Sequence, residues 1–220
     1  MANLNEEQNL CDEEKKIRPE ILYQLQKANK EIGNKNFPKY IQTIQKIFYL
    51  SDNVPVTKEL KIFMGGFIEG ESSLNVSAKK LPNAKFGLLI DPEFSITQHV
   101  NGIRNLYHAL KILNTGRIRY KQGSNATFVF IIDNRQTLKE KIIPFWETYV
   151  IPYGSPYLTK RLKSFKKILS LFESNAHQDK DRFCYELLPI WDSLRKQKGQ
   201  ANETFKSLEE AQEYIQMSKK

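Results

Sequence analysis

Apolar side chains recur along the chain at two spacings, one typical of helices and one typical of strands. Helical spacing after a proline predicts helices in "PEILYQLQKANKEI" and "PKYIQTIQKIFYL", so residues 1–56 are expected to form a helical extension. Thr57 is a suitable N-cap for a third helix, because its side-chain oxygen can accept a backbone N–H of the first turn. Similar patterns predict helices at about 157–173, 178–198 and 206–219, the last within a C-terminal segment of residues 200–220.

Strict alternation of apolar and polar residues predicts two hairpins between these helices. Residues 73–80 and 85–98 alternate on either side of "LPNAK", and "GRIRYK" and "TFVFIID" alternate on either side of "QGSN". A helix follows each hairpin, beginning near Asn101 and near Asn134. Residues 57–199 therefore form a core of helix, hairpin, helix, hairpin and helix, with further helices after it. This order predicts an α+β fold whose four-stranded antiparallel sheet has one face under helices and one open face.

Positive charge is concentrated in this core. The 220 residues carry a net charge of +9, and residues 57–199 hold 23 Lys and Arg against 13 Asp and Glu. Such a segment is typical of proteins that bind a polyanion, with nucleic acid first, although a soluble domain can be basic without such a partner. No apolar run approaches the roughly 20 residues of a membrane helix, so we expect no membrane partner. The two cysteines and three histidines show no disulfide or metal-ligand spacing.

Polar and basic side chains gather on the expected open face of the sheet. A two-stranded ribbon fits the major groove of DNA, where Arg and Lys read guanine and Asn and Gln read adenine. The alternative is a face that is merely solvated. The DNA contacts predicted from this face and its turns are Asn75, Ser77, Lys79, Lys80, Lys85, Glu93, Ser95, Thr97, Arg117, Arg119, Lys121, Gln122, Asn125 and Thr127.

The stretch "MGGFIEGES", residues 64–72, ends the third predicted helix with acids and glycines. An acid at a helix C-terminus is opposed by the helix dipole, so Glu69 and Glu71 indicate a nearby cation. Each glycine inside a helix costs about 0.5–1 kcal/mol relative to Ala, and glycines four residues apart let another backbone approach closely. Gly65, Gly66 and Gly70 are therefore predicted to form a helix–helix interface. The alternative, in which Gly70 simply ends the helix, leaves the other two unexplained.

This stretch resembles the LAGLIDADG motif of homing endonucleases. The predicted order of helices and hairpins is similar to the core of that family. The stretches "DPEFSITQHVNG", "TGRIRYKQGSNATFVFIIDNRQ" and "LPIWDSLRKQKGQ" resemble single-motif homodimeric members encoded in chloroplast ribosomal RNA group I introns. Glu69 and Glu71 stand where the family usually has Asp, and Ser72 replaces the final Gly. Each carboxylate is thereby one methylene further from the backbone than in Asp. A divalent cation can still bind it, because such cations require oxygen ligands and little else.

The resemblance implies a role for each part of the motif. Two motif helices, one from each subunit of a homodimer, would pack together at the glycines. Glu71 and the Gly70 carbonyl would hold Mg²⁺, or another divalent cation such as Mn²⁺ or Ca²⁺, over the scissile phosphates. Such an ion lowers the pKa of a bound water and neutralises charge that develops on the phosphate.

The resemblance also implies further catalytic residues. Gln98 stands where the family commonly has a polar residue near the metal, and a satisfied core amide is the alternative. Several relatives carry Arg where Gly102 stands. The missing cation is therefore assigned to Arg119, with Lys160 and Arg161 as a second basic group. For all three, phosphate anchoring without catalysis is the alternative.

The function implied is a Mg²⁺-dependent double-strand break in a long pseudo-palindromic DNA target, which starts intron homing. The alternative is a binding protein on the same scaffold, either an RNA maturase that binds its own intron RNA or an inactive DNA binder. Glu71 favours the nuclease, because a pure binder needs no acid facing phosphate. The segment "MANLNEEQNLCDEEKK" has neither an apolar core nor an Arg-rich pattern, so no signal or transit peptide is expected. The resemblance implies a protein encoded and working in the chloroplast.

Overall fold

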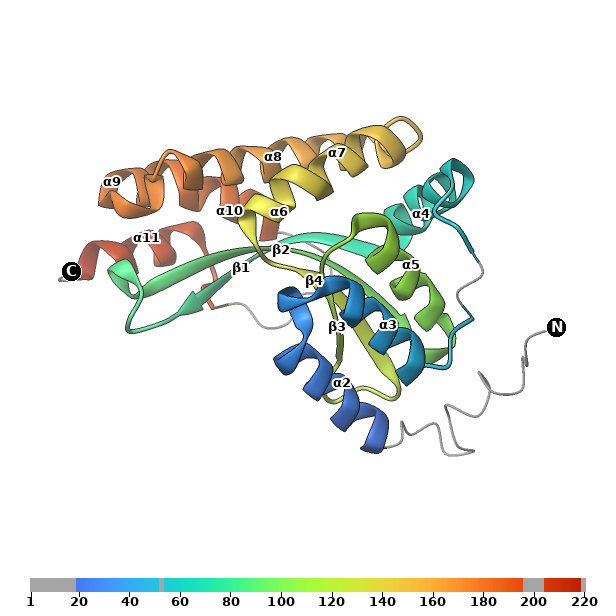
Figure 1. The fold of residues 1–220 in the computed structure, drawn as a ribbon. Coiled ribbons are helices and arrows are strands. Elements are labelled where there is room, and N and C mark those ends of the chain that lie inside the picture. Colours follow the sequence, from blue (N-terminus) through green and yellow to red (C-terminus); the bar gives the residue numbers. More distant parts are fainter. Residues whose placement is uncertain (1–18, 52–53, 196–203, 219–220) are drawn as a thin grey trace. The chain divides into compact units, whose positions relative to one another are not determined.

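The computed structural model describes residues 19–51, 54–195 and 204–218 (Figure 1). These residues form two compact units. The first contains residues 19–51, 54–73, 95–132 and 145–153, and the second contains residues 74–94, 133–144, 154–195 and 204–218. The expected helical extension thus belongs to the first unit and the expected C-terminal helix to the second, whereas the expected core contributes to both.

One four-stranded antiparallel sheet carries the open face, which confirms the predicted α+β class. Its strands are β1 (Ser72–Lys80), β2 (Leu88–His99), β3 (Arg117–Tyr120) and β4 (Thr127–Ile132), in the order β1-β2-β4-β3. In the outer pair, Ile118 of β3 lies opposite Phe130 of β4. Burial alternates along the strands as the sequence pattern predicts, so one face is covered and the other is open.

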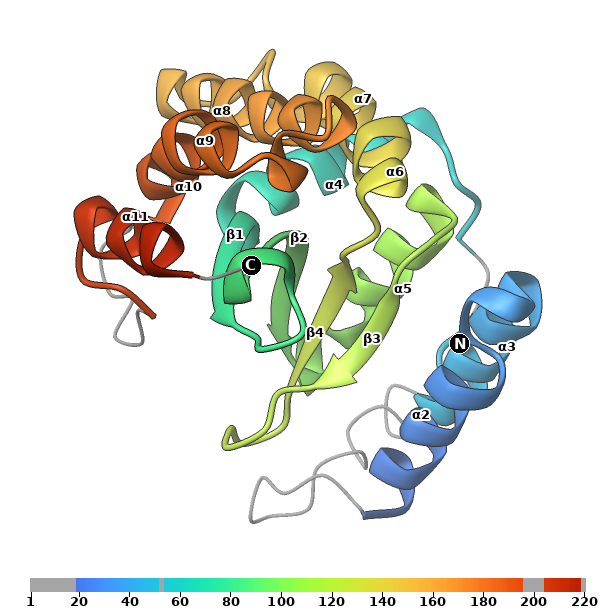
Figure 2. The same ribbon diagram turned by 90° about the vertical axis from the view of Figure 1, so that its left-hand side faces the viewer.

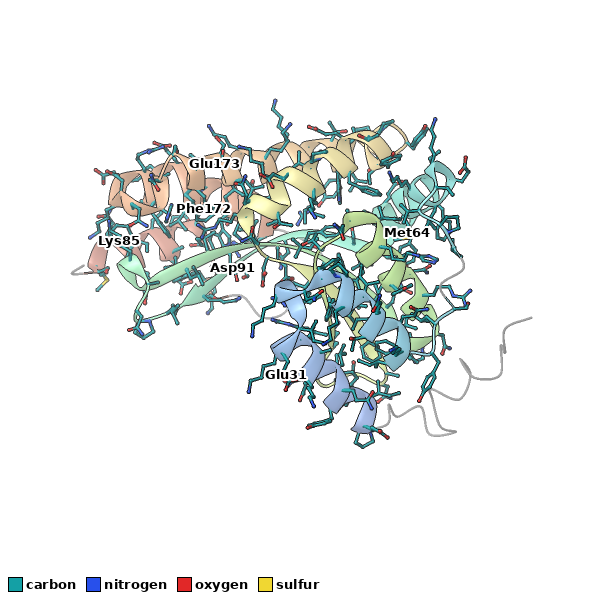
Figure 3. All side chains as sticks on the ribbon, viewed as in Figure 1. Glu31, Met64, Lys85, Asp91, Phe172 and Glu173 are labelled. Atoms are coloured by element: carbon teal, nitrogen blue, oxygen red, sulfur yellow. The ribbon has the colours of Figure 1, made fainter. Side chains whose placement is uncertain are left out.

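The helices of the first unit are α2 (Pro19–Glu31), α3 (Phe37–Ile47), α4 (Lys58–Glu71) and α5 (Ile103–Leu113), with short turns at Gly33–Lys35 and Val100–Gly102 and a π-helical segment at Trp146–Val150. Figure 2 shows α2 and α3 side by side. Thr57 caps α4 as expected, because its Oγ1 accepts the backbone N–H of Leu60 at 3.2 Å. Met64 on α4 is fully buried (Figure 3), and the ring of Phe48 packs edge-on against Phe128.

The second unit contains most of the later helices. They are α6 (Arg135–Thr137) with a π-helical segment at Leu138–Ile142, α8 (Pro156–Glu173), α9 (Lys180–Arg182) with Phe183–Leu187, α10 (Leu188–Arg195) and α11 (Leu208–Met217); α7 (Ile143–Phe145) crosses from this unit to the first. A further short turn lies at Ala176–Gln178. Asn134 caps α6, because its Oδ1 accepts the N–H of Thr137 at 2.9 Å. None of the helices in the described ranges is both long and apolar enough to cross a membrane.

The first hairpin differs from the sequence prediction at its turn. The expected second strand of residues 85–98 begins only at Leu88, because Lys85–Gly87 form a 3₁₀ turn. Phe86 has a φ of 60° there and its side chain is nevertheless buried against Phe183. Packing of this ring in the second unit therefore overrides the unfavourable left-handed backbone.

Candidate functional site

The C-terminal end of α4 presents an exposed carboxylate. Glu71 is the last residue of α4, and the chain passes directly into β1. Ser72 closes the helix, because its N–H and its Oγ both donate to the Ile68 carbonyl, the hydroxyl at 2.6 Å. The last turn of α4 carries no basic residue. The Glu71 carboxylate therefore lies at the negative end of the helix dipole with no cation in its own turn to offset it.

Gln98 is the hydrogen-bond partner of this carboxylate. Its Nε2 donates to Glu71 Oε2 at 3.1 Å, and both residues lie in the first unit. The sequence pattern placed Gln98 on the covered face of a strand end, where an amide requires a partner. The structure supplies Glu71 as that partner and leaves Gln98 half-buried at the end of β2.

Gly102 makes room for the Gln98 side chain. A Cβ at position 102 would lie 2.3 Å from Gln98 Oε1 and 3.2 Å from its Cδ, far inside van der Waals contact. From the sequence, Gly102 was interpreted only as a missing cation, and this packing role was not predicted. The contact arises because Gly102 ends the short Val100–Gly102 turn that returns the chain from β2 into α5.

The candidate cations lie in different parts of the molecule. Arg119 is exposed on β3 in the first unit, whereas Lys160 is exposed on α8 in the second. Arg161, next to Lys160, is only 8% exposed. Its guanidinium donates to the carbonyl of Leu194 at 3.1 Å and to that of Leu74, and burial lowers its pKa. Arg161 thus joins β1 to α10 and faces the interior, contrary to the expectation of a phosphate contact.

The remaining predicted DNA contacts are all half-buried or exposed. On the first-unit part of the sheet and its turn these are Ser95, Thr97, Arg117, Lys121, Gln122, Asn125 and Thr127. On the second-unit part they are Asn75, Ser77, Lys79, Lys80, Lys85 and Glu93. The sequence therefore predicted correctly which alternate positions along the strands face away from the covered side of the sheet.

The three lysines of the first hairpin have partners within their own unit. Lys79 Nζ lies 2.9 Å from Asp91 Oδ2 across the hairpin. Lys80 Nζ lies 4.7 Å from the ring centre of Phe205, and Lys85 Nζ donates to a backbone carbonyl at 2.5 Å. Asp91 was absent from the predicted contacts, although its odd position puts it on the same face as Glu93. The hairpin is therefore less uniformly cationic than its lysines suggest.

Comparison with known proteins gives consistent matches over the whole core. The family model described as LAGLIDADG endonuclease matches residues 64–172. The DNA endonuclease I-CeuI of Chlamydomonas moewusii is 52% identical over 206 residues, which cover 93% of this chain and 94% of that protein. This chain belongs to the LAGLIDADG endonuclease family. The motif-bearing helix is α4.

Solved structures agree with this membership. A structure of the group I intron-encoded homing endonuclease I-CeuI complexed with DNA matches with a TM-score of 0.87 and 52% identity, over 91% of this chain and 97% of that chain. The archaeal intron-encoded homing endonuclease I-Vdi141I, also complexed with DNA, matches with a TM-score of 0.63 and 26% identity, over 73% of this chain and 97% of that chain. The LAGLIDADG fold and nuclease class expected from the sequence are thereby confirmed.

The glycines of the LAGLIDADG helix face two different directions. Gly65 is buried, and a Cβ there would lie 2.2 Å from the backbone carbonyl oxygen of Tyr149 in the same chain. Gly66 and Gly70 are exposed, and a Cβ on either would meet nothing within 4 Å. Gly65 therefore serves packing within the chain, which corrects its assignment to a subunit interface. Gly66 and Gly70 remain on an outer face together with the exposed Phe63.

The end of the LAGLIDADG helix offers oxygen ligands suited to a hard divalent cation. The Glu71 carboxylate is exposed, and Gly70 lies in the last turn, whose carbonyls have no partner further along the helix. Among the described residues no three His, Cys, Asp or Glu side chains gather as a metal site. Glu71 and the Gly70 carbonyl are thus oxygen donors of the kind that a hard divalent cation prefers.

Proposed function

We propose that this protein is a site-specific homing endonuclease that hydrolyses both strands of a long, pseudo-palindromic DNA target as a Mg²⁺-dependent homodimer. The observation that carries the proposal is the Glu71 carboxylate, exposed at the end of the LAGLIDADG helix and held by the Gln98 amide. The 52% sequence identity between this chain and the DNA endonuclease I-CeuI supports DNA as the substrate. Localisation of the protein in the chloroplast stays a prediction from the sequence.

In the mechanism, Glu71 and the Gly70 carbonyl would hold the divalent ion, and Gln98 orients Glu71. When bound, the ion lowers the pKa of a water and offsets charge that develops on the scissile phosphate. Gln98 Nε2 occupies one oxygen of Glu71, so the other oxygen can be directed to the ion. Arg119 and Lys160 are the side chains proposed to face phosphates, since both are exposed cations.

A dimer supplies the second half of the catalytic centre. One chain carries one LAGLIDADG helix and hence one Glu71, whereas cutting two strands requires two reaction centres. The exposed strip of Gly66 and Gly70 on α4 lets a second copy of α4 approach closely, because neither glycine has a side chain. A divalent ion held at the helix end would also offset the helix dipole and the repulsion between carboxylates, which explains why an acid is tolerated there.

The decisive experiment replaces Glu71 by Gln and compares binding with cutting. Target DNA is first obtained by sequencing the ends cut from a library of candidate intron-insertion sites. Glu71→Gln keeps the volume and loses the charge that holds the cation. We expect normal DNA affinity in EDTA and loss of at least about 10²-fold in cleavage rate with Mg²⁺, the scale of removing an electrostatic catalytic group. Glu59→Gln, the same change at the other end of α4, is the matched control and should cut normally.

A mixed dimer sharpens this test. One wild-type and one Glu71→Gln subunit, purified through different affinity tags, are given supercoiled plasmid that carries the target. Nicked circles should accumulate beyond linear product if each acid serves mainly one strand, whereas both strands should fail together if both acids share one central ion. Full double-strand cutting by the doubly substituted dimer would refute the assignment of Glu71. An RNA maturase or an inactive binder would show binding and no cutting even for the wild type.

A further inference from the structure

A hollow in the first unit lies where the helical extension meets the outer strand of the sheet. It measures about 560 Å³ and lies between α2 and β3, with Leu22 and Leu25 among its lining residues. Its polar lining residues include Gln26 and Lys30 from α2 and Arg117, Arg119 and Gln122 from β3 and the following turn. Among the described residues that line the hollow, Lys30, Arg117 and Arg119 are cations and none is a carboxylate. The hollow is therefore suited to an anion.

Side-chain hydrogen bonds fix α2 against β3. The strand β3 is at the edge of the sheet, so the outward backbone groups of Ile118 need partners other than a strand. Asn29 Nδ2 donates to the Ile118 carbonyl at 2.9 Å, and the Ile118 N–H donates to Tyr40 Oη at 3.0 Å. Tyr40 Oη in turn donates to Asn29 Oδ1 at 2.7 Å. Tyr40 is completely buried, and this burial raises its pKa to about 12, so its hydroxyl stays protonated.

This anchor determines which side chains of α2 face the hollow. Positions 26, 29 and 30 lie three to four residues apart, so they share one face of the helix. Asn29 makes the contact with Ile118, and its neighbours Gln26 and Lys30 are exposed beside it. Arg117 and Arg119 flank Ile118 on β3 and point to the opposite side of the strand from it. The basic side chains of β3 and Lys30 of α2 therefore border the same hollow.

We infer that α2 is a second DNA-binding element and that the hollow between it and β3 holds a backbone phosphate of the target. This inference rests on the proposed function and deepens it. Arg119 supplies a planar fork of donors for phosphate oxygens, and Lys30 supplies a compact charge on the other side. Because phosphate contacts position a protein without reading sequence, α2 contributes affinity and register, while the sheet contributes base specificity.

The test compares two lysines of the same helix. Lys30 lines the hollow and Lys27 does not, and both are exposed on α2. Affinity for target DNA and for unrelated DNA is measured in EDTA at several salt concentrations for wild type, Lys30→Gln and Lys27→Gln. The salt slope is the slope of the logarithm of the affinity against the logarithm of the salt concentration. Loss of one phosphate contact lowers its magnitude by about 0.9, so loss of one contact per subunit lowers it by about 1.8 for a dimer. When salt rises from 50 to 200 mM, the factor by which wild-type affinity falls should therefore be about 12 times the factor by which Lys30→Gln affinity falls.

The outcomes separate this inference from the proposed function. We expect Lys27→Gln to match wild type, and Lys30→Gln to weaken target and unrelated DNA equally at low salt with unchanged thermal stability. A salt slope for Lys30→Gln equal to that of wild type would overturn the inference while leaving the endonuclease intact. An effect on intron RNA alone would also overturn it, because the occupant would not be DNA. A wild-type protein without salt-dependent DNA binding would instead refute the proposed function itself.

Discussion

Two adjacent glycines of the LAGLIDADG helix should respond in opposite ways to the same substitution. Gly65 and Gly66 occupy consecutive positions in α4, and each gains one methyl group on change to Ala. A Cβ on Gly65 would lie 2.2 Å from the Tyr149 carbonyl oxygen and 2.9 Å from its carbonyl carbon. A Cβ on Gly66 would meet nothing within 4 Å. The pair therefore separates helix propensity from packing.

The magnitudes follow from two terms. Replacing Gly by Ala inside a helix stabilises it by about 1 kcal/mol at either position. At Gly65 the collision is with backbone, which cannot rotate away, and overpacking of this kind typically costs about 1–3 kcal/mol. Gly66→Ala should thus raise the free energy of unfolding by about 1 kcal/mol, whereas Gly65→Ala should change it by between zero and about −2 kcal/mol. The difference between the variants, about 1–3 kcal/mol, corresponds to about 2–12 °C in Tm.

The assay uses Trp146, which lies in the π-helical segment that contains Tyr149. The chain has two tryptophans, so in a Trp191→Phe background the fluorescence of Trp146 reports on the first unit alone. Urea unfolding is followed at dilutions where sedimentation shows monomers. At higher concentration Gly66→Ala should weaken self-association, because Gly66 faces outward, and Gly65→Ala should not. Equal unfolding free energies for the two variants would refute the contact between Gly65 and Tyr149.

Three further predictions concern hydrogen bonds of the first unit. Tyr40→Phe should lower the unfolding free energy by about 1–3 kcal/mol in urea titrations, because the buried N–H of Ile118 loses its acceptor. Burial raises the pKa of Tyr40 from 10.0 to about 12, so the contribution of Tyr40 to the free energy of unfolding should be full below about pH 10 and should fall as pH rises toward 12. Unfolding measured against pH should show this loss in the wild type and not in Tyr40→Phe. Gly102→Ala should displace the Gln98 amide and break its bond to Glu71, so single-turnover cleavage should slow while DNA affinity in EDTA stays unchanged.

The elements of this fold could be predicted because their signals are local. Thr57 caps the helix that the sequence assigned to it, through a backbone N–H three residues away, and the helix expected near Asn134 begins at Arg135. Asn101, also expected to be a cap, does not cap α5, whose N-cap is Gly102. The strands were found because alternation has a period of two, and burial follows it in β1, β2 and β4. Local rules failed first at Lys85–Gly87, where the buried ring of Phe86 stabilises a left-handed residue.

Partners far apart in the sequence were not predictable from spacing. Whether Gly65 or Gly66 faces inward depends on a rotation of about 100° per residue and on Tyr149, which is distant along the chain. Arg161 offered a better signal that was overlooked. It lies four residues before Phe165 and seven before Ile168, so helical spacing places it on the buried face of α8.

The LAGLIDADG helix serves three purposes because successive residues point in different directions. Gly65 admits the backbone of Tyr149, Gly66 and Gly70 leave two positions of an outer face without side chains, and Glu71 ends the helix. These purposes differ in how much change they tolerate. The contact at Gly65 is with backbone and accepts no Cβ, whereas the carboxylate stands on a side chain in an exposed position and is held by a flexible amide. The flexible Gln98 amide on β2 can therefore follow the Glu71 carboxylate, which stands one methylene further from the backbone than the carboxylate of an Asp would.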